Sequence, residues 1–359
     1  MSSERGDAAL PPEIIAAVVP AYNESRRIRD VVQGIPQYVN PIIVVNDASR
    51  DDTSAVLRAL AAQDRRVVPL DHDVNQGVGG AMITGFQEAL KRRVDIVVKI
   101  DGDGQMPMEF LPALLEPLLA READYSKGNR FRDLDALRRM PLPRRLGNLV
   151  LSFAAKAVTG YWDSFDPTNG FFAIRSQVLR VLPLTRVDRS YFFEHSMLIY
   201  LYLAGAKIQD VPMPSRYGDE TSKLRISQVL YSFPPKLLSA LVRRVVLKNF
   251  LYDFTMASLY LLAALPLLTF GVTYGLYSWI YYTSRGIGAP TGTVVVPTLC
   301  IILAVQFLLA AVEIDLRSTP KVPLTRDTVH HGERLAEEAV RGAASDDATE
   351  PTSSVRAVQ

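Results

Sequence analysis

Two long uncharged segments in the last third of the chain restrict its possible folds more than any other feature. No charged residue occurs between Asp253 and Arg285, and a second uncharged run continues to Glu313, with its apolar part at Val294–Val312. Either run is long enough to cross a bilayer, which takes about 20 apolar residues. A buried hairpin in a soluble core is the alternative, but uncharged runs of this length favour a two-span transmembrane hairpin over residues 253–313.

The basic residues around this hairpin are distributed unevenly. They precede the first run and follow the second at Arg317, Lys321 and Arg326, whereas the connecting loop has Arg285 alone. The positive-inside rule therefore predicts a multi-pass protein of the cell membrane with both termini in the cytoplasm. Aromatic residues also gather at one end of the first run, as in an interfacial belt. They are Tyr274, Tyr277, Trp279, Tyr281 and Tyr282.

The segment just before the hairpin, residues 223–252, alternates basic residues with leucine and valine. We expect a helix from Leu224 to Lys248 that is interrupted at Pro234 and Pro235. An ordinary surface helix is one interpretation. The position directly before the apolar runs favours a helix that lies in the membrane interface.

Composition excludes several classes of protein. The formal net charge is only +2, which provides no general signal for nucleic-acid binding. The single cysteine, Cys300, excludes an internal disulfide, and the four histidines show no metal-ligand spacing. Residues 1–12 contain no apolar core of the signal-peptide kind, so we expect a disordered start and a cytoplasmic amino-terminal domain. The polar residues 314–359 are expected to form a largely disordered cytoplasmic tail.

Residues 13–222 alternate short β-type runs with helical patterns, which predicts an α/β domain. Alternation of this length is typical of a mostly parallel, Rossmann-like sheet covered by helices on both faces. Such sheets bind ligands beyond the carboxyl ends of their strands. The first predicted strands are Ile14–Val19, Ile42–Val45, Val67–Leu70 and Ile96–Ile100, with helices at 25–35, 52–62 and 77–92 between them. Later elements are predicted as helices at 145–158 and 192–204 and strands at 171–174 and 207–211.

The most informative polar segment follows the strand predicted at Ile96–Ile100. Asp101, Asp103 and Gln105 can direct their oxygen atoms at one hard cation, and the glycines between them let the backbone turn closely. Mg²⁺ or Mn²⁺ held there would bridge a diphosphate and neutralise a departing nucleotide. An isolated Asp-x-Asp usually marks a turn, so its position at the end of a buried strand is what favours a metal site.

Three further polar or glycine-rich segments accompany the predicted strands, at Pro20–Glu24, Asn46–Thr53 and Asn75–Ala81. The first two can be simple helix caps. They also lie at the same expected sheet edge as the acidic segment, where Glu24 and Asp47 can contact a base and a ribose. The third fails as a dinucleotide fingerprint, because its glycine pattern is incomplete and does not follow the first strand.

In this order and spacing, the four segments resemble family 2 glycosyltransferases of the GT-A type. Within that family the chain is similar to dolichol-phosphate mannose synthases and bacterial polyprenyl-phosphate glycosyltransferases. Three later segments extend the resemblance, which covers about Ile14 to Lys248: Gly128–Phe131, Asp166–Phe171 and Arg216–Lys223. Two departures are Asn46 before Asp47, where the family often has two aspartates, and the acidic pair Asp219-Glu220.

The resemblance implies inverting transfer of one hexose from a nucleotide diphosphate sugar to polyprenyl (undecaprenyl) phosphate, with the bilayer as a further partner. It implies a UDP-hexose such as UDP-glucose as donor, with GDP-mannose as the alternative. The implied catalytic residues are Asp101, Asp103 and Asp166, and the metal ligands for Mg²⁺ or Mn²⁺ are Asp101, Asp103 and Gln105. Nucleotide contacts are implied for Pro20, Tyr22, Glu24, Asp47, Gly77 and Asp101. Acceptor-phosphate contacts are implied for Arg130, Arg145, Arg216, Ser222 and Lys223.

Other functions remain as alternatives. A processive polysaccharide synthase is disfavoured by the two spans and by the absence of a Gln/Arg-x-x-Arg-Trp motif. A non-catalytic membrane scaffold is disfavoured by the intact Asp101–Gln105 segment, and a nicotinamide oxidoreductase by the incomplete glycine pattern. Self-association is left open.

Overall fold

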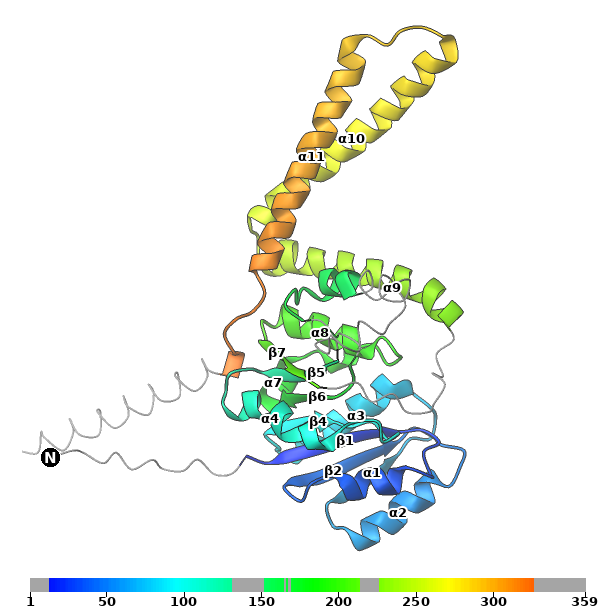
Figure 1. Cartoon of the computed structure of the whole chain (residues 1–359), viewed down its shortest axis with the longest axis vertical. Helices are drawn as coiled ribbons and strands as arrows, with labels where there is room; N and C mark the ends of the chain where they lie inside the picture. Colours follow the sequence, from blue (N-terminus) through cyan, green and yellow to red (C-terminus); the bar gives the residue numbers. More distant parts are fainter. Residues whose placement is uncertain (1–12, 131–151, 165, 167–168, 214–225, 326–359) are drawn as a thin grey trace, which may run out of the picture.

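A seven-stranded mixed sheet is the centre of the larger domain (Figure 1). The computed structural model describes residues 13–130, 152–164, 166, 169–213 and 226–325. The strand order is β3-β2-β1-β4-β6-β5-β7, in which β6 runs antiparallel to β4 and β5 and the other pairs are parallel. The strands are β1 Ile15–Ala21, β2 Val39–Asn46, β3 Val67–Asp71, β4 Ile96–Lys99, β5 Tyr125–Asn129, β6 Phe172–Arg175 and β7 Ile208–Pro212.

Helices cover both faces of this sheet because its central strands are mostly apolar, and β1 is apolar at every position. In β1, Ile15, Ala17 and Val19 pack with α1, α2 and α4, while Ala16 and Val18 pack with α3, α7 and α8. The prediction of a largely parallel α/β sheet buried on both faces is therefore confirmed. The helices are α1 Ile28–Gly34, α2 Thr53–Gln63, α3 Gly77–Lys91, α4 Leu111–Leu119, α7 Ser176–Val181 and α8 Phe193–Leu203. Short 3-10 turns are η1 Met108–Phe110 and η2 Leu184–Arg186.

Two helices project away from this domain as a hairpin (Figure 1). These helices, α10 Met256–Arg285 and α11 Thr291–Arg317, are long and apolar enough to cross a membrane. In their most apolar parts only 22% and 17% of the residues are buried inside the protein. A core helix of a soluble protein would be mostly buried, so this exposure favours contact with lipid.

The helix α9, Ile226–Val246, lies between the α/β domain and the hairpin and continues as the π-helical segment η3, Leu247–Tyr252 (Figure 1). The expected interruption at Pro234 and Pro235 is wrong, because α9 runs through both prolines. A proline removes one backbone hydrogen bond and crowds the preceding turn. Here the helix is supported from the side: Leu237, on the following turn, is buried against Val158, Phe192 and Ile199 of the α/β domain.

A buried cluster of polar side chains joins the base of the hairpin to the α/β domain. Asp315 of α11 accepts two hydrogen bonds of 2.9 Å from the Arg244 guanidinium and one of 3.1 Å from Lys248. It also accepts from Trp162 Nε1 at 3.1 Å and from the Tyr202 hydroxyl at 3.2 Å. One carboxylate thus connects α11 to α9, to η3, and to α8 and the turn at Trp162 in the larger domain.

Residues directly after α11 return to the α/β domain, so the first residues of the expected tail, up to Thr325, are ordered. The buried Asp124 carboxylate accepts from the backbone N–H groups of Leu324, at 2.8 Å, and Thr325, at 3.2 Å. The Thr325 hydroxyl, itself buried, donates to it at 2.9 Å. A buried carboxylate needs such donors, and the chain after α11 supplies them. Residues 1–12 and 326–359 lie outside the described residues.

The boundaries of the predicted elements agree with the structure to within a few residues. Of the helix expected at 145–158, only 152–158 lies within the described residues; it is helical, and the helix continues to residue 159. Three elements of the sheet domain, α4, β5 and the short helix α7, were not predicted. The apolar residues of α4 are interrupted by Pro112 and Pro117, and β5 contains Lys127, Gly128 and Asn129, so neither has a clear apolar period.

Candidate active site

The segments after β1 and β2 are held together at the carboxyl edge of the sheet. The Asn23 backbone N–H donates to Ser49 Oγ at 2.9 Å, and the Arg50 N–H donates to Asn23 Oδ1 at 2.8 Å. The Glu24 N–H donates to Thr53 Oγ1 at 3.0 Å. Parallel strands end at the same edge, so two segments far apart in sequence form one rigid rim.

Three predicted nucleotide contacts belong to the first of these segments. Tyr22 is exposed, and Pro20 and Glu24 are half-buried. The Pro20 carbonyl oxygen lies so close to Gly102 that a Cβ there would be 3.1 Å from it. The segment after β1 therefore adjoins the acidic segment after β4, as the sequence predicts.

Asp47 is almost fully buried and organises the start of α3. Its carboxylate accepts from the backbone N–H groups of Gln76 and Gly77, each at 2.8 Å, and contacts His72 Nδ1 at 2.8 Å. A carboxylate at the first turn of a helix satisfies N–H groups that lack helical partners and is favoured by the helix dipole. Contact of Asp47 with a nucleotide base stays a prediction. The structure shows in addition that Asp47 positions the start of α3.

The glycines at the start of α3 are explained by close packing of backbone. Gly77 has a φ of +81°, and a Cβ there would lie 2.5 Å from the Arg189 carbonyl oxygen. A Cβ at Gly79 would clash with the Asp188 carbonyl oxygen and lie 2.8 Å from Arg189 Cα. The segment 188–190 thus rests directly on the glycines, and a nucleotide contact of Gly77 remains a prediction.

Asp101 and Asp103 line one pocket of about 380 Å³ at the end of β4. Arg27 of the segment before α1 lines it as well, together with Met106. The Asp103 carboxylate accepts the Gln105 backbone N–H at 3.0 Å, and the Gln105 side chain is exposed. The structure brings the two aspartates of the predicted metal set together, whereas Gln105 is not among the described residues that line the pocket.

A buried lysine connects Asp101 to a residue that the sequence analysis missed. Lys99 Nζ lies 2.7 Å from Asp101 Oδ1 and 3.4 Å from Glu194 Oε1. Burial alone would lower the pKa of Lys99, but the two carboxylates outweigh it and raise that pKa. Burial and the nearby Asp101 raise the pKa of Glu194 despite the opposing charge of Lys99. A lysine inside an apolar strand and a glutamate in the apolar helix α8 were the available signals.

Asp166 and Arg130, predicted as separate site residues, form an ion pair. Arg130 Nε is 2.8 Å from Asp166 Oδ2, Nη2 is 3.1 Å from Oδ1, and the Arg130 backbone N–H donates to Oδ2 at 3.2 Å. The fully buried Lys127 ammonium donates to the Asp166 carbonyl oxygen. Burial would raise the pKa of Asp166, but the hydrogen bonds and charge of Arg130, with the charge of Lys127, hold that pKa below its ordinary value.

The other predicted acceptor contacts cannot be placed. Arg145, Arg216, Ser222 and Lys223 lie outside the described residues. Their roles stay predictions.

The residues of the acidic pocket fit a divalent cation that is shared between the protein and a bound diphosphate. Within the described part of the chain, no group of three or more His, Cys, Asp or Glu side chains is arranged to hold a metal ion. Mg²⁺ does not require such a group, since it is commonly bound by one or two carboxylates together with substrate phosphates and water. Asp101 and Asp103 supply two carboxylates in one pocket, which meets this requirement.

The sheet order and the acidic pocket at its carboxyl edge are compatible with a nucleotide-dependent transferase, and comparison with known proteins shows the family. The family model for "Glycosyl transferase family 2" matches residues 16–182. The chain is 30% identical over 237 residues to the UDP-N-acetylglucosamine–dolichyl-phosphate N-acetylglucosaminyltransferase of Methanococcus voltae, covering 62% of this chain and 94% of that protein. It is 31% identical to the undecaprenyl-phosphate mannosyltransferase of Micrococcus luteus, over 55% of this chain and 82% of that protein.

A third relative is the polyprenol monophosphomannose synthase of Mycolicibacterium smegmatis, with 30% identity over 56% of this chain and 77% of that protein. The chain belongs to glycosyl transferase family 2 and is a glycosyltransferase with the GT-A fold. The predicted family, fold class and enzyme class are thereby confirmed.

Proposed function

We propose that this enzyme transfers a single hexose from a nucleotide diphosphate sugar to polyprenyl phosphate at the membrane surface. One observation carries the proposal. The Asp101–Asp103 pocket belongs to a domain whose Trp162 and Tyr202 donate hydrogen bonds to Asp315, at the base of two exposed apolar helices. A sugar-transferring domain attached to a membrane hairpin is suited to a lipid acceptor. The names of the three relatives, each of which includes a dolichyl, undecaprenyl or polyprenol group, support the same acceptor class.

The donor is proposed as a UDP-hexose such as UDP-glucose, with GDP-mannose as the alternative. The relatives support both, since one is named for UDP-N-acetylglucosamine and two for mannose or phosphomannose. Bound Mg²⁺ or Mn²⁺ would neutralise the diphosphate of the donor and the nucleoside diphosphate that leaves. Asp101 and Asp103 would hold the metal, and Tyr22 and Glu24 are the proposed nucleotide contacts on the adjoining segment.

The acceptor needs positioning more than activation. A phosphate monoester has a second pKa of about 6, so it is mostly a dianion at neutral pH. The dianion is already a nucleophile. Its oxygen attacks the anomeric carbon while the bond from that carbon to the diphosphate breaks, which inverts the anomeric centre. The Arg130 side chain is 41% exposed, and its guanidinium carries five N–H donors, so pairing with Asp166 and contact with a phosphate are compatible.

A panel of labelled nucleotide sugars tests the reaction. UDP- and GDP-linked hexoses are each incubated with undecaprenyl phosphate and the full chain in detergent, and label is measured in the organic phase. We expect one donor to yield a lipid-linked monosaccharide. Formation of long polymer would instead identify a processive synthase, and absence of lipid-linked label with every donor would contradict the proposal.

The topology proposed with this function places the α/β domain and both termini in the cytoplasm. Basic residues on the two outer flanks of the hairpin support it. A single cysteine at position 288, in a Cys300→Ala background, should react with a membrane-impermeant thiol reagent in intact cells. A cysteine at the exposed Arg58 should react only after lysis, and the reverse pattern would overturn the topology.

A further inference from the structure

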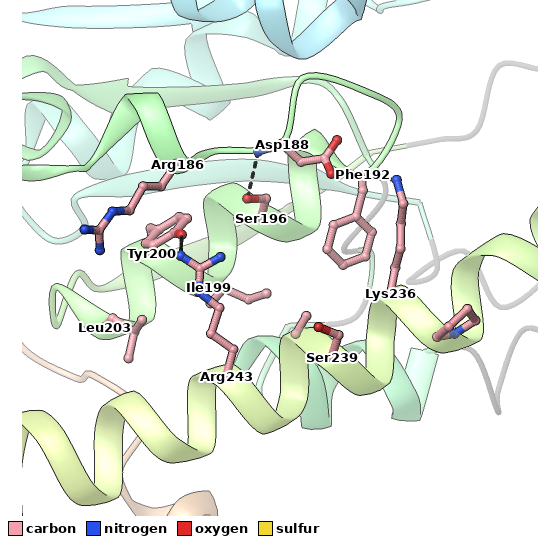
Figure 2. Close-up of a pocket in the computed structure, with 12 residues that line it drawn as sticks. Arg186, Asp188, Phe192, Ser196, Ile199, Tyr200, Leu203, Lys236, Ser239 and Arg243 are labelled. Atoms are coloured by element: carbon pink, nitrogen blue, oxygen red, sulfur yellow. Dashed lines mark hydrogen bonds and ion pairs between the residues drawn. The ribbon is translucent and has the colours of Figure 1, made fainter.

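A second cavity, separate from the acidic pocket, lies between α8 and α9 (Figure 2). This α8–α9 groove has a volume of about 410 Å³ and shares no described lining residue with the pocket of Asp101 and Asp103. Phe192, Ile199 and Leu203 contribute apolar surface from the α8 side. The groove therefore combines an apolar wall with the charged residues at its rim.

The rim of the α8–α9 groove is basic. Arg186, Lys236 and Arg243 line it, and Asp188 is the single acidic residue among the described lining residues. Lys236 Nζ lies 3.7 Å from Asp188 Oδ2, which partly compensates both charges. Within the described chain, neither Arg186 nor Arg243 is ion-paired. Arg243 lies 5.4 Å above the Tyr200 ring and donates to the Tyr200 hydroxyl, which orients the guanidinium without neutralising it.

The groove opens beside an apolar stripe of α9. Leu238, Val242 and Val246 recur at every fourth residue and are 63%, 54% and 48% exposed. With about 3.6 residues per turn, such a spacing keeps the three side chains on one side of the helix. Arg243 lies next to Val242 in sequence and, with Ser239, lines the groove at the side of this stripe. An exposed apolar stripe flanked by cations is typical of a helix in the membrane interface.

The base of the hairpin gives the level of the groove relative to the bilayer. Arg244, the residue after Arg243, is ion-paired with Asp315 near the end of α11 at 2.9 Å. The end of the groove that is lined by Arg243, toward the carboxyl end of α9, therefore lies where the hairpin meets the α/β domain. Phosphate headgroups occupy this depth of a membrane when the apolar helices span its hydrocarbon core.

We propose that the α8–α9 groove binds the headgroup of an anionic glycerophospholipid from the leaflet that faces the α/β domain. The guanidinium groups of Arg186 and Arg243 would hold the phosphate, since a planar guanidinium can form two hydrogen bonds with it. Phe192 and Ile199 would contact the glyceride and the first carbons of the acyl chains. An anionic leaflet attracts juxtamembrane cations, so charge complementarity favours this occupant over a neutral lipid.

Native mass spectrometry of the delipidated full chain in detergent, titrated with phosphatidylglycerol or phosphatidylcholine of matched acyl chains, tests the proposal. We expect one phosphatidylglycerol molecule to bind at least about tenfold more tightly than phosphatidylcholine. The Arg186→Gln/Arg243→Gln variant should lose on the order of ten- to hundredfold in affinity for phosphatidylglycerol, because charge-assisted hydrogen bonds are removed. Its affinity for phosphatidylcholine should not change.

A matched control separates the groove from diffuse attraction. Arg317→Gln/Lys321→Gln removes two exposed charges, one at the last residue of α11 and one just after it, both outside the groove, and should retain phosphatidylglycerol binding. Ser239→Phe keeps every charge but fills the groove, and should weaken binding as well. Thermal unfolding in lipid-free detergent checks that each variant is folded.

Three results would overturn the proposal. Equal losses in the two double variants would mean that binding depends only on overall charge. Displacement of phosphatidylglycerol by inorganic phosphate at equal concentration would identify a simple anion site. Displacement by undecaprenyl phosphate at equal concentration would make the groove part of the acceptor site.

Discussion

At the scale of single residues, the candidate site depends on charges that are paired inside the protein. Lys99 is shared between Asp101 and Glu194, and Arg130 is bound by Asp166. Each pairing fixes a functional candidate in place, because a buried charge without a partner is unstable. The chemistry of these residues therefore cannot be separated from their contribution to stability.

Asp103→Asn should abolish transfer while the protein stays folded. The substitution removes a carboxylate from the proposed metal pocket, and we expect a loss in kcat/KM on the order of a hundredfold or more. Asp73→Asn, at an exposed aspartate, is the matched control and should leave activity unchanged. Chelation with EDTA should reproduce the loss and added Mg²⁺ or Mn²⁺ should reverse it in the wild type. Full wild-type activity in metal-free buffer would contradict the assignment.

Asp166→Asn should lower the stability of the folded protein at neutral pH. It should also remove part of the decrease in stability that the wild type shows in acid. The pKa of Asp166 is lowered in the folded protein, so its contribution is present above the ordinary aspartate pKa of about 3.9 and is lost as pH falls through the lowered value. Loss of charge-assisted hydrogen bonds at this position costs about 1.5–3 kcal/mol. Thermal unfolding from pH 7 to pH 3 should show the two proteins converging in acid. A constant difference across that range would refute the assigned shift.

At the scale of elements, contacts with neighbouring elements decide the positions of α3 and α9, through the backbone for α3 and through buried side chains for α9. The first turn of α3 lies against the segment 188–190, which only glycine at positions 77 and 79 allows. The helix α9 tolerates Pro234 and Pro235 because its buried side packs on the α/β domain. In both cases the neighbouring element sets the local conformation.

Gly79→Ala should destabilise the protein and displace the segment 188–190. The added Cβ would lie against backbone atoms, which cannot rotate away, and overpacking of this kind costs about 1–3 kcal/mol. Gly34→Ala, in a helix where a Cβ meets nothing within 4 Å, should be neutral or slightly stabilising. Chemical denaturation of the two variants makes the comparison. Equal free energies of unfolding for the two variants would mean that the backbone around Gly79 shifts to accommodate the added Cβ at little cost.

At the scale of the whole molecule, the apolar hairpin and the α/β domain form a connected unit. Asp315 joins α11 to Arg244 and Lys248 and to Trp162 and Tyr202. Residues beyond α11 then return to Asp124. The candidate active site is thereby held at a defined position relative to the hairpin, which a lipid acceptor requires.

Asp315→Asn should loosen the hairpin from the α/β domain. The almost fully buried Arg244 would lose its anionic partner, and breaking a buried pair costs about 3–5 kcal/mol. Glu313→Gln, which removes an exposed pair with Arg317 in the same helix, should cost less than about 1 kcal/mol. Limited proteolysis between residues 247 and 256, together with thermal unfolding, measures the effect. Identical proteolysis of the two variants would show that Asp315 does not connect the parts.

The sequence alone predicted the architecture and the location of the site, because both depend on patterns along the chain. Apolar runs without charge indicated the hairpin, alternating apolar periods indicated the covered sheet, and the polar segments followed the predicted strands. The Asp101–Gln105 segment was recognisable because its candidate metal ligands are close in sequence.

Only the tertiary structure decided which charges meet across the fold. Lys99 with Glu194, Arg130 with Asp166 and Arg244 with Asp315 are far apart along the chain, so no local pattern pairs them. The α8–α9 groove likewise exists only where two helices pack, and its basic rim comes from both sides. Sequence periodicity reports which face of an element is buried, whereas the partner on that face is determined by how the chain folds back.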